Sequence, residues 1–436
     1  MKYILFEKLS FESSERILEV QDMMLCSHLA YLKRYSPFYR EVLSGISVES
    51  IQTRNIHKLP LTTKSAIEKE PEKFLTCTNE EIADTVHTSG TSGQKIFFHY
   101  TESDLKRLAY NEAQALKSTG ITKHDKVLLL CTMDKCFIAG LAYYSGCRKI
   151  GASVIRSGAT SPDACGELVM KLKPTVIIGV PSFMLKLAQY LTTLNVQFNN
   201  SVKKLICIGE PLRCYDAHNF ERLKSTNLCE KIEKFWQAEA FSTYALTETV
   251  TTFCECREKK GGHLIPELGI VEIVDDNNQV LPCGEEGEII VTPFHITGMP
   301  LLRYKTGDIG RLMPEKECGC GRKTLRLGPV SGRKFQMLKV KGTKFYPSSV
   351  YSVLDSIDEV ILYQLIAERR ELSDKLTVKI ALSGEANPEI TEKISNKLRA
   401  SLRVKIELEF ADKKELRESL FPQGTRKPIK FKELIS

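Results

Sequence analysis

The runs that decide the fold are KVLLLC at 126–131, ASVIR at 152–156, TVIIGV at 175–180 and KLICIG at 204–209. Each run is short and continuously apolar, as expected of a strand that is buried on both faces. Segments with helical spacing of apolar residues separate the runs, for example PSFMLKLAQYLTTL at 181–194. Because strands and helices alternate, the sequence predicts an α/β fold with a mainly parallel sheet.

Two further helices are predicted upstream of these runs. Apolar residues at helical spacing predict one helix over about 13–45. The other is SDLKRLAYNEAQALKSTG, in which Ser103 is the expected N-cap and Gly120 is the residue that stops the helix. Between the two helices, VHTSGTSG is predicted to be the end of a short strand followed by a loop.

The pattern changes from about residue 269 onward. GIVEIVDDNNQVLPCGEEGEIIVT is predicted to form two antiparallel strands with a turn at 275–278, and therefore a β-rich subregion. Strands and helices alternate again after about residue 336, over a length that is usual for one domain. We therefore predict a large N-terminal α/β domain at 1–335, which contains the β-rich subregion, and a small C-terminal α+β domain at 336–436.

The composition is that of an ordinary globular chain with a modest basic excess. The 436 residues include 62 basic and 54 acidic side chains, for a net charge of +8. This excess suits anionic small molecules, and the lack of an arginine-rich arm or tail argues against nucleic acid as a partner.

The first residues lack the features of a signal peptide, and no apolar stretch is long enough to span a bilayer. We expect a cytoplasmic protein without a membrane partner, with its 14 cysteines reduced.

A polar loop follows the first of the predicted strands. It consists of Thr88, Ser89, Gly90, Thr91, Ser92, Gly93, Gln94 and Lys95. The glycines allow turns that direct successive backbone N–H groups into one concavity, and the hydroxyls add donors, which suits phosphate oxygens. The spacing of a Walker A motif is absent. Taken alone, the segment is equally compatible with a flexible surface loop.

Three further motifs carry polar side chains that a nucleotide could use. YALTE at 244–248 combines an aromatic ring with a hydroxyl beside a carboxylate, which suits a purine, a phosphate and Mg²⁺. In YKTGD at 304–308, an aspartate after a glycine turn can accept two hydrogen bonds from a ribose diol. GTRKPIK at 424–430 is basic. Taken alone, these segments are more typical of a strand end, a turn and a solvated terminus.

In this order and spacing, the motifs resemble those of the phenylacetate–CoA ligase family, within the adenylate-forming superfamily. The resemblance covers nearly the whole chain. It extends to SPFYR at 36–40, LPLTTK at 59–64, VPS at 180–182, GEP at 209–211 and MPLLRY at 299–304. It implies that the small C-terminal domain is mobile relative to the large one.

The resemblance implies a binding site for ATP. The loop at 88–95 would hold the β- and γ-phosphates of the nucleotide. Gly209, Glu210 and Pro211 would lie against the adenine, and Tyr244 would stack near it.

The resemblance also implies which residues act at the α-phosphate. Thr247 would contact this phosphate, and Glu248 would bind Mg²⁺. Asp308 would bind the ribose hydroxyls, with Arg333 beside it. Lys427 resembles the lysine of the small domain that bridges the carboxylate and the α-phosphate during adenylation, where a point cation stabilises the developing charge. The candidate catalytic residues are therefore Lys427, Thr247 and Glu248.

The chain departs from the family pattern at four places. Gln94 replaces the usual lysine of the loop, so that backbone amides and hydroxyls would make most of the phosphate contacts. Ala245 replaces the usual glycine. Phe335 and Gln336 stand where the family has two aspartates, the second of which marks the hinge of the small domain. The stretch at 134–140 replaces a glycine-rich segment that helps to shape the acyl pocket in relatives, which argues against phenylacetate itself as the substrate.

The implied function is that of an AMP-forming carboxylate–CoA ligase for an aromatic or arylacetic acid. ATP and the acid would give an acyl-adenylate and pyrophosphate, and CoA would then attack the acyl carbon. In a second hypothesis, a carrier-protein thiol or another acceptor replaces CoA. In a third, the chain is a non-catalytic nucleotide-binding protein, as Gln94, Ala245 and Gln336 could indicate. Relatives are often dimers, so the resemblance is compatible with a homodimer.

A separate group of cysteine and histidine residues is typical of a metal site. Cys256, His263, Cys318 and Cys320 are the best set of ligands for a structural zinc ion, because the two pairs can meet across two loops. Cys254 is expected to stay out of the site, since a fifth ligand is rarely accommodated. Some members of the resembled family have a similar cluster. In the alternative without a metal, Cys318 and Cys320 are ordinary loop thiols.

Overall fold

A computed structural model of the chain describes residues 6–88, 95–195, 198, 200–216, 219–313, 317–340, 342–370, 373–422 and 428–434. The chain forms two compact units. The larger unit comprises Met1–Thr306 with Gly310–Val330, and the smaller one comprises Gly307–Ile309 with Ser331–Ser436. A mixed α/β chain with a large and a small part confirms the predicted fold class. The boundary at residue 335 remains a prediction about the domains.

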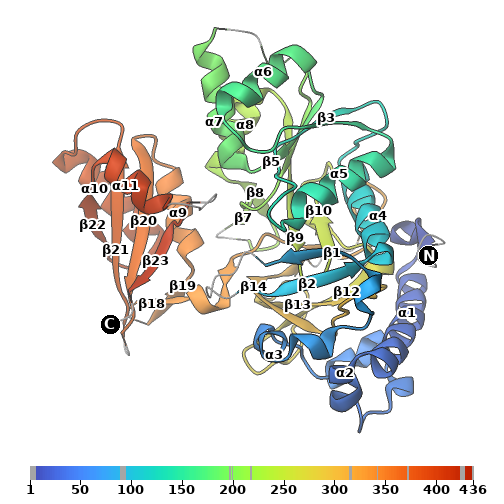
Figure 1. Cartoon of the computed structure of the whole chain (residues 1–436). Helices are drawn as coiled ribbons and strands as arrows, with labels where there is room; N and C mark the ends of the chain where they lie inside the picture. Colours follow the sequence, from blue (N-terminus) through green and yellow to red (C-terminus); the bar gives the residue numbers. More distant parts are fainter. Residues whose placement is uncertain are drawn as a thin grey trace. The chain divides into compact units, whose positions relative to one another are not determined.

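The larger unit is built on a sheet of nine strands, counted over the described residues. In chain order the strands are β3 Lys126–Leu129, β4 Ser153–Arg156, β5 Val176–Gly179, β6 Lys204–Cys207, β9 Glu239–Leu246, β10 Thr251–Cys254, β11 Gly262–His263, β15 Leu312–Met313 and β16 Arg326–Leu327. Their order in the sheet is β15-β16-β11-β10-β9-β6-β5-β3-β4 (Figure 1). The strands from β9 to β4 are parallel, and those from β9 to β15 are antiparallel. The four apolar runs therefore form parallel strands, as predicted.

Helices cover both faces of the parallel strands (Figure 1). They are α4 Glu102–Ser118, α5 Ile138–Ile150, α6 Pro162–Leu172, α7 Pro181–Thr193 and α8 Asn227–Trp236. Successive side chains of a strand point to opposite faces. Val127 of β3 accordingly packs in a core shared with α4 and α5, whereas Leu128 packs in a core shared with α6, α7 and α8. The sheet is buried on both sides, which explains why its strands are continuously apolar.

The N-terminal helical region differs in detail from the prediction. In place of one helix over 13–45, there are two helices, α1 Ser14–Tyr35 and α2 Pro37–Val42. They are separated at Ser36, whose hydroxyl accepts a hydrogen bond from the first turn of α2. A proline disfavours the helical conformation in the residue before it, and this steric restriction ends α1.

The predicted N-cap of α4 is also wrong by two residues. Thr101, not Ser103, caps the helix, because Thr101 and Asp104 form a capping box in which each side chain accepts from the backbone N–H of the other. The predicted end is confirmed, since the helix stops before Gly120, which has a left-handed φ of 79°.

The β-rich subregion contains its two predicted strands, β12 Gly269–Val274 and β13 Gly287–Pro293, which pair antiparallel. The predicted turn at 275–278 does not join them directly. It leads to a single bridge between Val274 and Val280, and β13 begins only at Gly287. Pro282 has no N–H to donate to a ladder, which accounts for the longer connection.

The described part of the larger unit also contains shorter elements. They are α3 Lys64–Lys69, β1 Ile82–His87, β2 Phe97–Thr101, β7 Arg213–Tyr215, β8 Leu223–Ser225 and the first residues of β14 Tyr304–Gly310. The strands β1 and β2 form an antiparallel pair, as do β7 and β8. These two pairs flank segments that carry candidate site residues.

The smaller unit contains a sheet with the order β22-β21-β20-β23. Its elements are β17 Gly332–Arg333, β18 Leu338–Val340, β19 Thr343–Phe345, α9 Pro347–Asp355, β20 Val360–Glu368, β21 Lys375–Leu382, α10 Pro388–Leu402, β22 Glu407–Phe410, α11 Lys413–Leu420 and β23 Phe431–Leu434. Side chains of β20, β21, α9 and α10 form its core. Strands and helices alternate in this unit, as predicted for the chain after about residue 336. Over the described parts of both units, no helix combines the length and apolar character needed to cross a bilayer.

Candidate nucleotide site and metal centre

The polar loop joins β1 to β2. Ser89, Gly90, Thr91, Ser92, Gly93 and Gln94 lie outside the described residues. Thr88, at the start of the loop, is buried, and its N–H donates to the carbonyl of Ile96 at 3.0 Å. Within the part of the chain that is described, the hydroxyl of Thr88 has no hydrogen-bond partner. A buried hydroxyl in this state is costly, so a ligand that accepts from it would be favoured.

Lys95, at the end of the loop, contacts a histidine that the sequence did not single out. Its Nζ lies 3.3 Å from Nε2 of His87, and Nδ1 of His87 lies 3.0 Å from the carbonyl oxygen of Thr88. An ammonium group can only donate, so the contact with Lys95 requires Nε2 of His87 as the acceptor, and the contact with Thr88 then requires Nδ1 as the donor. His87 therefore holds the cation of Lys95 at the neck of the loop.

The residues expected to contact adenine follow two neighbouring parallel strands. Cys207 of β6 is opposite Ser242 of β9, so the segment 209–211 and Tyr244 lie toward the same edge of the sheet. This carboxyl edge is where ligands bind in open α/β folds. The carboxylate of Glu210 accepts from both the N–H and the hydroxyl of Ser182, each at 2.9 Å, which ties it to the first turn of α7.

The ring of Tyr244 is supported from the neighbouring strand. It stacks on Phe253 of β10, with ring centroids 5.9 Å apart and an interplanar angle of 19°. Phe253 is buried, whereas Tyr244 is half-buried. Phe253 therefore fixes the orientation of the ring that the resemblance assigns to adenine.

Two tyrosines hold the segment that contains Thr247 and Glu248. The hydroxyl of Tyr100 donates to the carbonyl oxygen of Thr247 at 2.6 Å, and the hydroxyl of Tyr304 donates to Oε1 of Glu248 at 3.5 Å. Burial raises the pKa of Tyr100 well above its ordinary value, and the charge of Glu248 raises it further. Tyr100 thus remains a donor, and Glu248 presents a carboxylate of the kind that Mg²⁺ prefers.

Asp308 and Arg333 belong to the smaller unit and are paired there. They are opposite each other in the ladder between β14 and β17, and Nε of Arg333 lies 3.4 Å from Oδ1 of Asp308. Asp308 is buried, whereas the side chain of Arg333 is 41% exposed. The pairing agrees with the resemblance, in which Arg333 lies beside the ribose-binding carboxylate.

The basic C-terminal segment is described only in part. Lys427 lies outside the described residues. Lys430 is described, and its Nζ donates to the hydroxyl of Tyr363 at 2.7 Å while it lies over the rings of Tyr351 and Tyr363. These contacts, with Asp355 at 4.0 Å, give Lys430 a structural role in the smaller unit.

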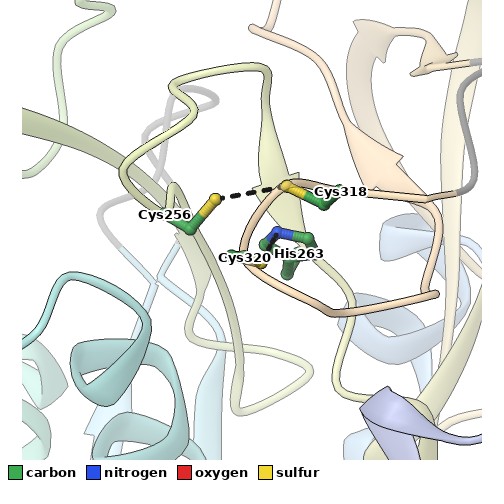
Figure 2. Close-up of side chains that lie close together, drawn as sticks. All are labelled: Cys256, His263, Cys318 and Cys320. Carbon is green, nitrogen blue, oxygen red and sulfur yellow. Dashed lines mark hydrogen bonds between the residues drawn. The ribbon is translucent and has the colours of Figure 1, made fainter.

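The structure brings together the four residues that the sequence selected as metal ligands (Figure 2). One ligand atom from each of Cys256, His263, Cys318 and Cys320 lies within 4.8 Å of the others. The Sγ atoms of Cys256 and Cys318 are 3.5 Å apart without a disulfide, and Sγ of Cys320 is 3.4 Å from Nε2 of His263. Cys256 follows β10, His263 is in β11, and the other two cysteines lie in the turn between β15 and β16.

Neighbouring groups orient these ligands. Nδ1 of His263 lies 3.2 Å from the hydroxyl of Thr324, which directs Nε2 toward the cluster. The guanidinium of Arg322 donates to Sγ of Cys320 at 3.4 Å. Burial alone would raise the pKa of Cys320, but hydrogen bonds from His263 and Arg322 outweigh it and lower the pKa to about 5. A thiolate, the form that binds a metal ion, is therefore favoured at Cys320.

The cluster fits a tetrahedral zinc ion. Zinc–sulfur distances of about 2.3 Å and zinc–nitrogen distances of about 2.0 Å place the ligand atoms of such a site roughly 3.5–3.8 Å apart. The separations of 3.4 and 3.5 Å in the cluster are close to this geometry. Cys254 is buried and does not belong to the cluster, as expected.

Sequence patterns did not indicate several residues that support these sites. They are His87, Ser182, Phe253, Tyr100 and Thr324. Ser182 does occur within the family-like VPS segment, and this was the available signal. Tyr100 and Thr324 lie far from their partners in the chain, and His87 and Phe253 lie near theirs without a motif to mark the contact.

The chain was compared with known proteins. The AMP-binding enzyme family matches residues 39–297, and the C-terminal domain of AMP-binding enzymes matches residues 342–423. The phenylacetate-coenzyme A ligase of Thermus thermophilus is 27% identical over 87% of this chain and 84% of its own length. That of Aromatoleum evansii is 26% identical over 84% and 83%. Among solved structures, a 2-hydroxyisobutyryl-CoA ligase in the postadenylation state has a TM-score of 0.81 at 19% identity, over 97% of this chain and 90% of that one.

Proposed function

This chain belongs to the AMP-binding enzymes and, within them, to the phenylacetate–coenzyme A ligase family, and from that premise we propose that it is an ATP-dependent carboxylate–CoA ligase. The carboxylate attacks the α-phosphate of ATP and expels pyrophosphate, which gives an acyl-adenylate. The thiol of CoA then attacks the acyl carbon, and AMP leaves as the thioester forms. Neither step needs a nucleophile from the protein. The similarity to the curated ligases confirms the predicted family and the predicted class, an AMP-forming acid–thiol ligase.

One observation carries the assignment of the nucleotide residues. The GEP and YALTE motifs are far apart in the sequence, yet they follow strands β6 and β9, which are neighbours and parallel. Ligands bind at this edge because the loops after such strands diverge there. Two side chains at this edge have fixed orientations and would form the two walls of an adenine site. Glu210 is hydrogen-bonded to Ser182, and Tyr244 stacks on Phe253.

The chemistry of the remaining residues supports roles at the phosphates. Glu248 is proposed to bind Mg²⁺, Thr247 to contact the α-phosphate, and Asp308 with Arg333 to bind the ribose. The loop from Thr88 to Lys95 is proposed to hold the β- and γ-phosphates, with Lys95 oriented by His87. Lys427 is proposed as the cation that brings the carboxylate and the α-phosphate together, since Lys430 is engaged by two tyrosines.

The acid is proposed to be an aromatic or arylacetic acid other than phenylacetate. The altered stretch at 134–140 motivates this choice. Two adjacent residues in it, Lys135 and Cys136, have left-handed φ angles of 59° and 52°, a conformation that is uncommon outside glycine. CoA is the proposed acceptor, and a carrier-protein thiol remains the alternative. A homodimer and a cytoplasmic location remain predictions from the sequence.

We also propose a structural zinc ion at Cys256, His263, Cys318 and Cys320. Four protein ligands leave no position for a substrate or an activated water, so the ion would tie the turn between β15 and β16 to β10 and β11. Metal analysis of the purified chain should give about one zinc per chain. A chain without zinc, with the four residues intact, would contradict the site.

A pyrophosphate-exchange screen over aromatic, arylacetic and fatty acids tests the proposed function. At least one aromatic acid should support exchange in the absence of CoA. When CoA is added with the same acid, the enzyme should consume the CoA. Exchange without CoA consumption would favour a different acceptor. The absence of exchange with every acid would contradict adenylation.

A further inference from the structure

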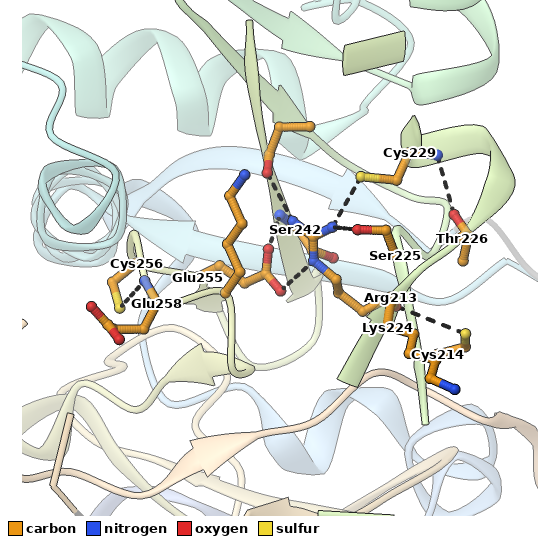
Figure 3. A network of polar contacts seen from close by, with 12 residues as sticks. Arg213, Cys214, Lys224, Ser225, Thr226, Cys229, Ser242, Glu255, Cys256 and Glu258 are labelled. Carbon is orange, nitrogen blue, oxygen red and sulfur yellow. Dashed lines mark hydrogen bonds and ion pairs between the residues drawn. The ribbon is translucent and has the colours of Figure 1, made fainter. Parts of the chain in front are cut away.

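A buried ion pair joins Glu255, which precedes the metal ligand Cys256, to Arg213, which follows the segment 209–211 (Figure 3). That segment lies at the carboxyl edge of β6 and β9, here called the adenine edge. Nε of Arg213 is 3.2 Å from Oε1 of Glu255, and the two side chains are 4% and 2% exposed. Neither residue belongs to a motif that the sequence singled out. Glu255 lies between Cys254 and Cys256, and Arg213 begins β7, two residues after Pro211.

Arg213 uses its other nitrogens to join three elements. Nη1 donates to the hydroxyl of Ser225 in β8 at 2.8 Å and to Sγ of Cys229 in α8 at 3.0 Å. Nη2 donates to the carbonyl oxygen of Ala240 in β9 at 3.0 Å. The guanidinium therefore fixes the chain immediately after the Gly209–Glu210–Pro211 segment against the strand that carries Tyr244.

Glu255 contacts the same strand two residues further along the chain, at Ser242. Its Oε2 accepts from the N–H of Ser242 at 2.9 Å, and its own N–H donates to the carbonyl oxygen of Ser242 at 3.0 Å. Ser242 is two residues before Tyr244. The ion pair thus closes a bridge that runs from Pro211 through Arg213 and Glu255 to β9.

Stability alone does not account for this pair. Removing two charges from water is costly, and well-packed apolar residues are often as stabilising as a buried ion pair. An arginine differs from an apolar residue in that its planar guanidinium holds several hydrogen-bond acceptors in one fixed geometry. Of the groups that Arg213 contacts, Ala240 lies in β9, the strand that carries Tyr244, and Glu255 contacts the same strand at Ser242.

We propose that Arg213 and Glu255 are positioning residues that set the Glu210 segment against Tyr244, so that ATP affinity depends on their pairing. The inference rests on the proposed function, since it assumes that these walls hold ATP. Neither residue touches the nucleotide in this account. Their effect passes through the backbone of β9 and through the chain that leads back to Pro211.

The test measures the affinity for ATP with Mg²⁺, without acid or CoA, by equilibrium dialysis. Arg213→Lys retains the charge but loses the fork, and it should weaken ATP binding about tenfold. Ser225→Ala, a milder change that removes one hydrogen bond to Arg213, should weaken binding about two- to threefold. In pyrophosphate exchange, the KM for ATP should rise while the maximal rate stays within about twofold, because Lys427 and Glu248 are unchanged.

Leu187→Ala is the matched control for a loss of stability alone. Leu187 of α7 is fully buried in the core that α6, α7 and α8 form with the sheet, and its apolar side chain makes no hydrogen bond to the bridge. The single tryptophan, Trp236, ends α8 and is buried, so its fluorescence reports whether each variant keeps this region folded. Leu187→Ala should lower Tm without changing the affinity for ATP.

The outcomes separate the two proposals. If the unaltered chain fails to bind ATP, the proposed function is wrong and the inference falls with it. If the unaltered chain binds ATP and both Arg213→Lys and Ser225→Ala bind it equally well, the inference alone is overturned. It is also overturned if Leu187→Ala weakens ATP binding as much as the variants of the bridge do.

Discussion

The metal centre and the nucleotide site are assembled in different ways. All four candidate zinc ligands belong to the larger unit, and their ligand atoms lie within 4.8 Å of one another. The residues proposed to contact adenine also belong to the larger unit, but they follow two different strands, and their side chains are held by partners outside the motifs, Ser182 for Glu210 and Phe253 for Tyr244. The metal centre consists of ligands that lie together by themselves, whereas the adenine edge depends on supporting residues.

The first prediction concerns Lys427, the proposed catalytic cation of the nucleotide site. Lys427→Ala should lower the rate of carboxylate-dependent pyrophosphate exchange about 100- to 1000-fold, the usual cost of removing one electrostatic catalytic group. Exchange kinetics with saturating acid measure the effect. Lys430→Ala is the matched control, because Lys430 is held by Tyr363 and should contribute to stability rather than to rate. Equal losses in both variants would contradict the assignment of Lys427.

The second prediction concerns the metal centre. Cys320→Ser should abolish zinc binding and lower the free energy of unfolding by roughly 3 kcal/mol, since the loss of a structural metal is among the larger effects of a single mutation. Metal analysis and urea denaturation measure the two changes. Cys254→Ala, two residues from Cys256 and outside the cluster, should keep its zinc. Full zinc content in Cys320→Ser would remove this residue from the site.

The third prediction concerns the scaffold behind both regions. Glu112 in α4 is buried and accepts from the hydroxyl of Thr252 in β10, the strand that leads to Cys256. Burial raises the pKa of Glu112 from 4.5 to about 7. Between these pH values the folded chain retains a proton that the unfolded chain has released, so this group's contribution to stability falls as the pH rises through the window.

Glu112→Gln removes this titration and serves as its test. The stability of the variant relative to the unaltered chain should rise between pH 5 and pH 8, by up to roughly 3 kcal/mol. Urea denaturation at the two pH values measures the change. A constant difference between the two chains would show that Glu112 titrates normally.

The smallest expected effect concerns the support of the Mg²⁺ ligand. Tyr304→Phe removes a long hydrogen bond of 3.5 Å to Glu248 and should raise the Mg²⁺ concentration for half-maximal exchange about twofold. A titration of exchange against Mg²⁺ measures it. An unchanged requirement would show that Tyr304 does not orient the carboxylate.

The sequence was informative where the signal was local or where the residue types were rare. Continuous apolar runs identified the parallel strands, and ligand chemistry identified the four members of the metal cluster before their proximity was known. The N-cap of α4 was misplaced because Thr101 and Ser103 are both good capping residues and only the capping box with Asp104 distinguishes them. The turn at 275–278 has good turn residues, yet it does not directly join β12 to β13.

Two long-range pairs that support the proposed sites were not predicted. Glu210 with Ser182, and Arg213 with Glu255, join residues 28 and 42 positions apart. Which residues pair depends on which strands become neighbours in the sheet. A single sequence does not reveal that order or the register of the strands. The metal cluster could be predicted although its ligands are far apart, because cysteine and histidine are uncommon residues and typical metal ligands.

The transfer of labelled oxygen from the acid to AMP tests the central claim most directly. The acid with the highest exchange rate is labelled with ¹⁸O in both carboxylate oxygens and incubated with ATP, Mg²⁺ and CoA, and the AMP is analysed by mass spectrometry. If the carboxylate attacks the α-phosphate, each AMP carries one ¹⁸O atom and the acyl-CoA keeps the other. Unlabelled AMP, or ADP in its place, would contradict an acyl-adenylate intermediate.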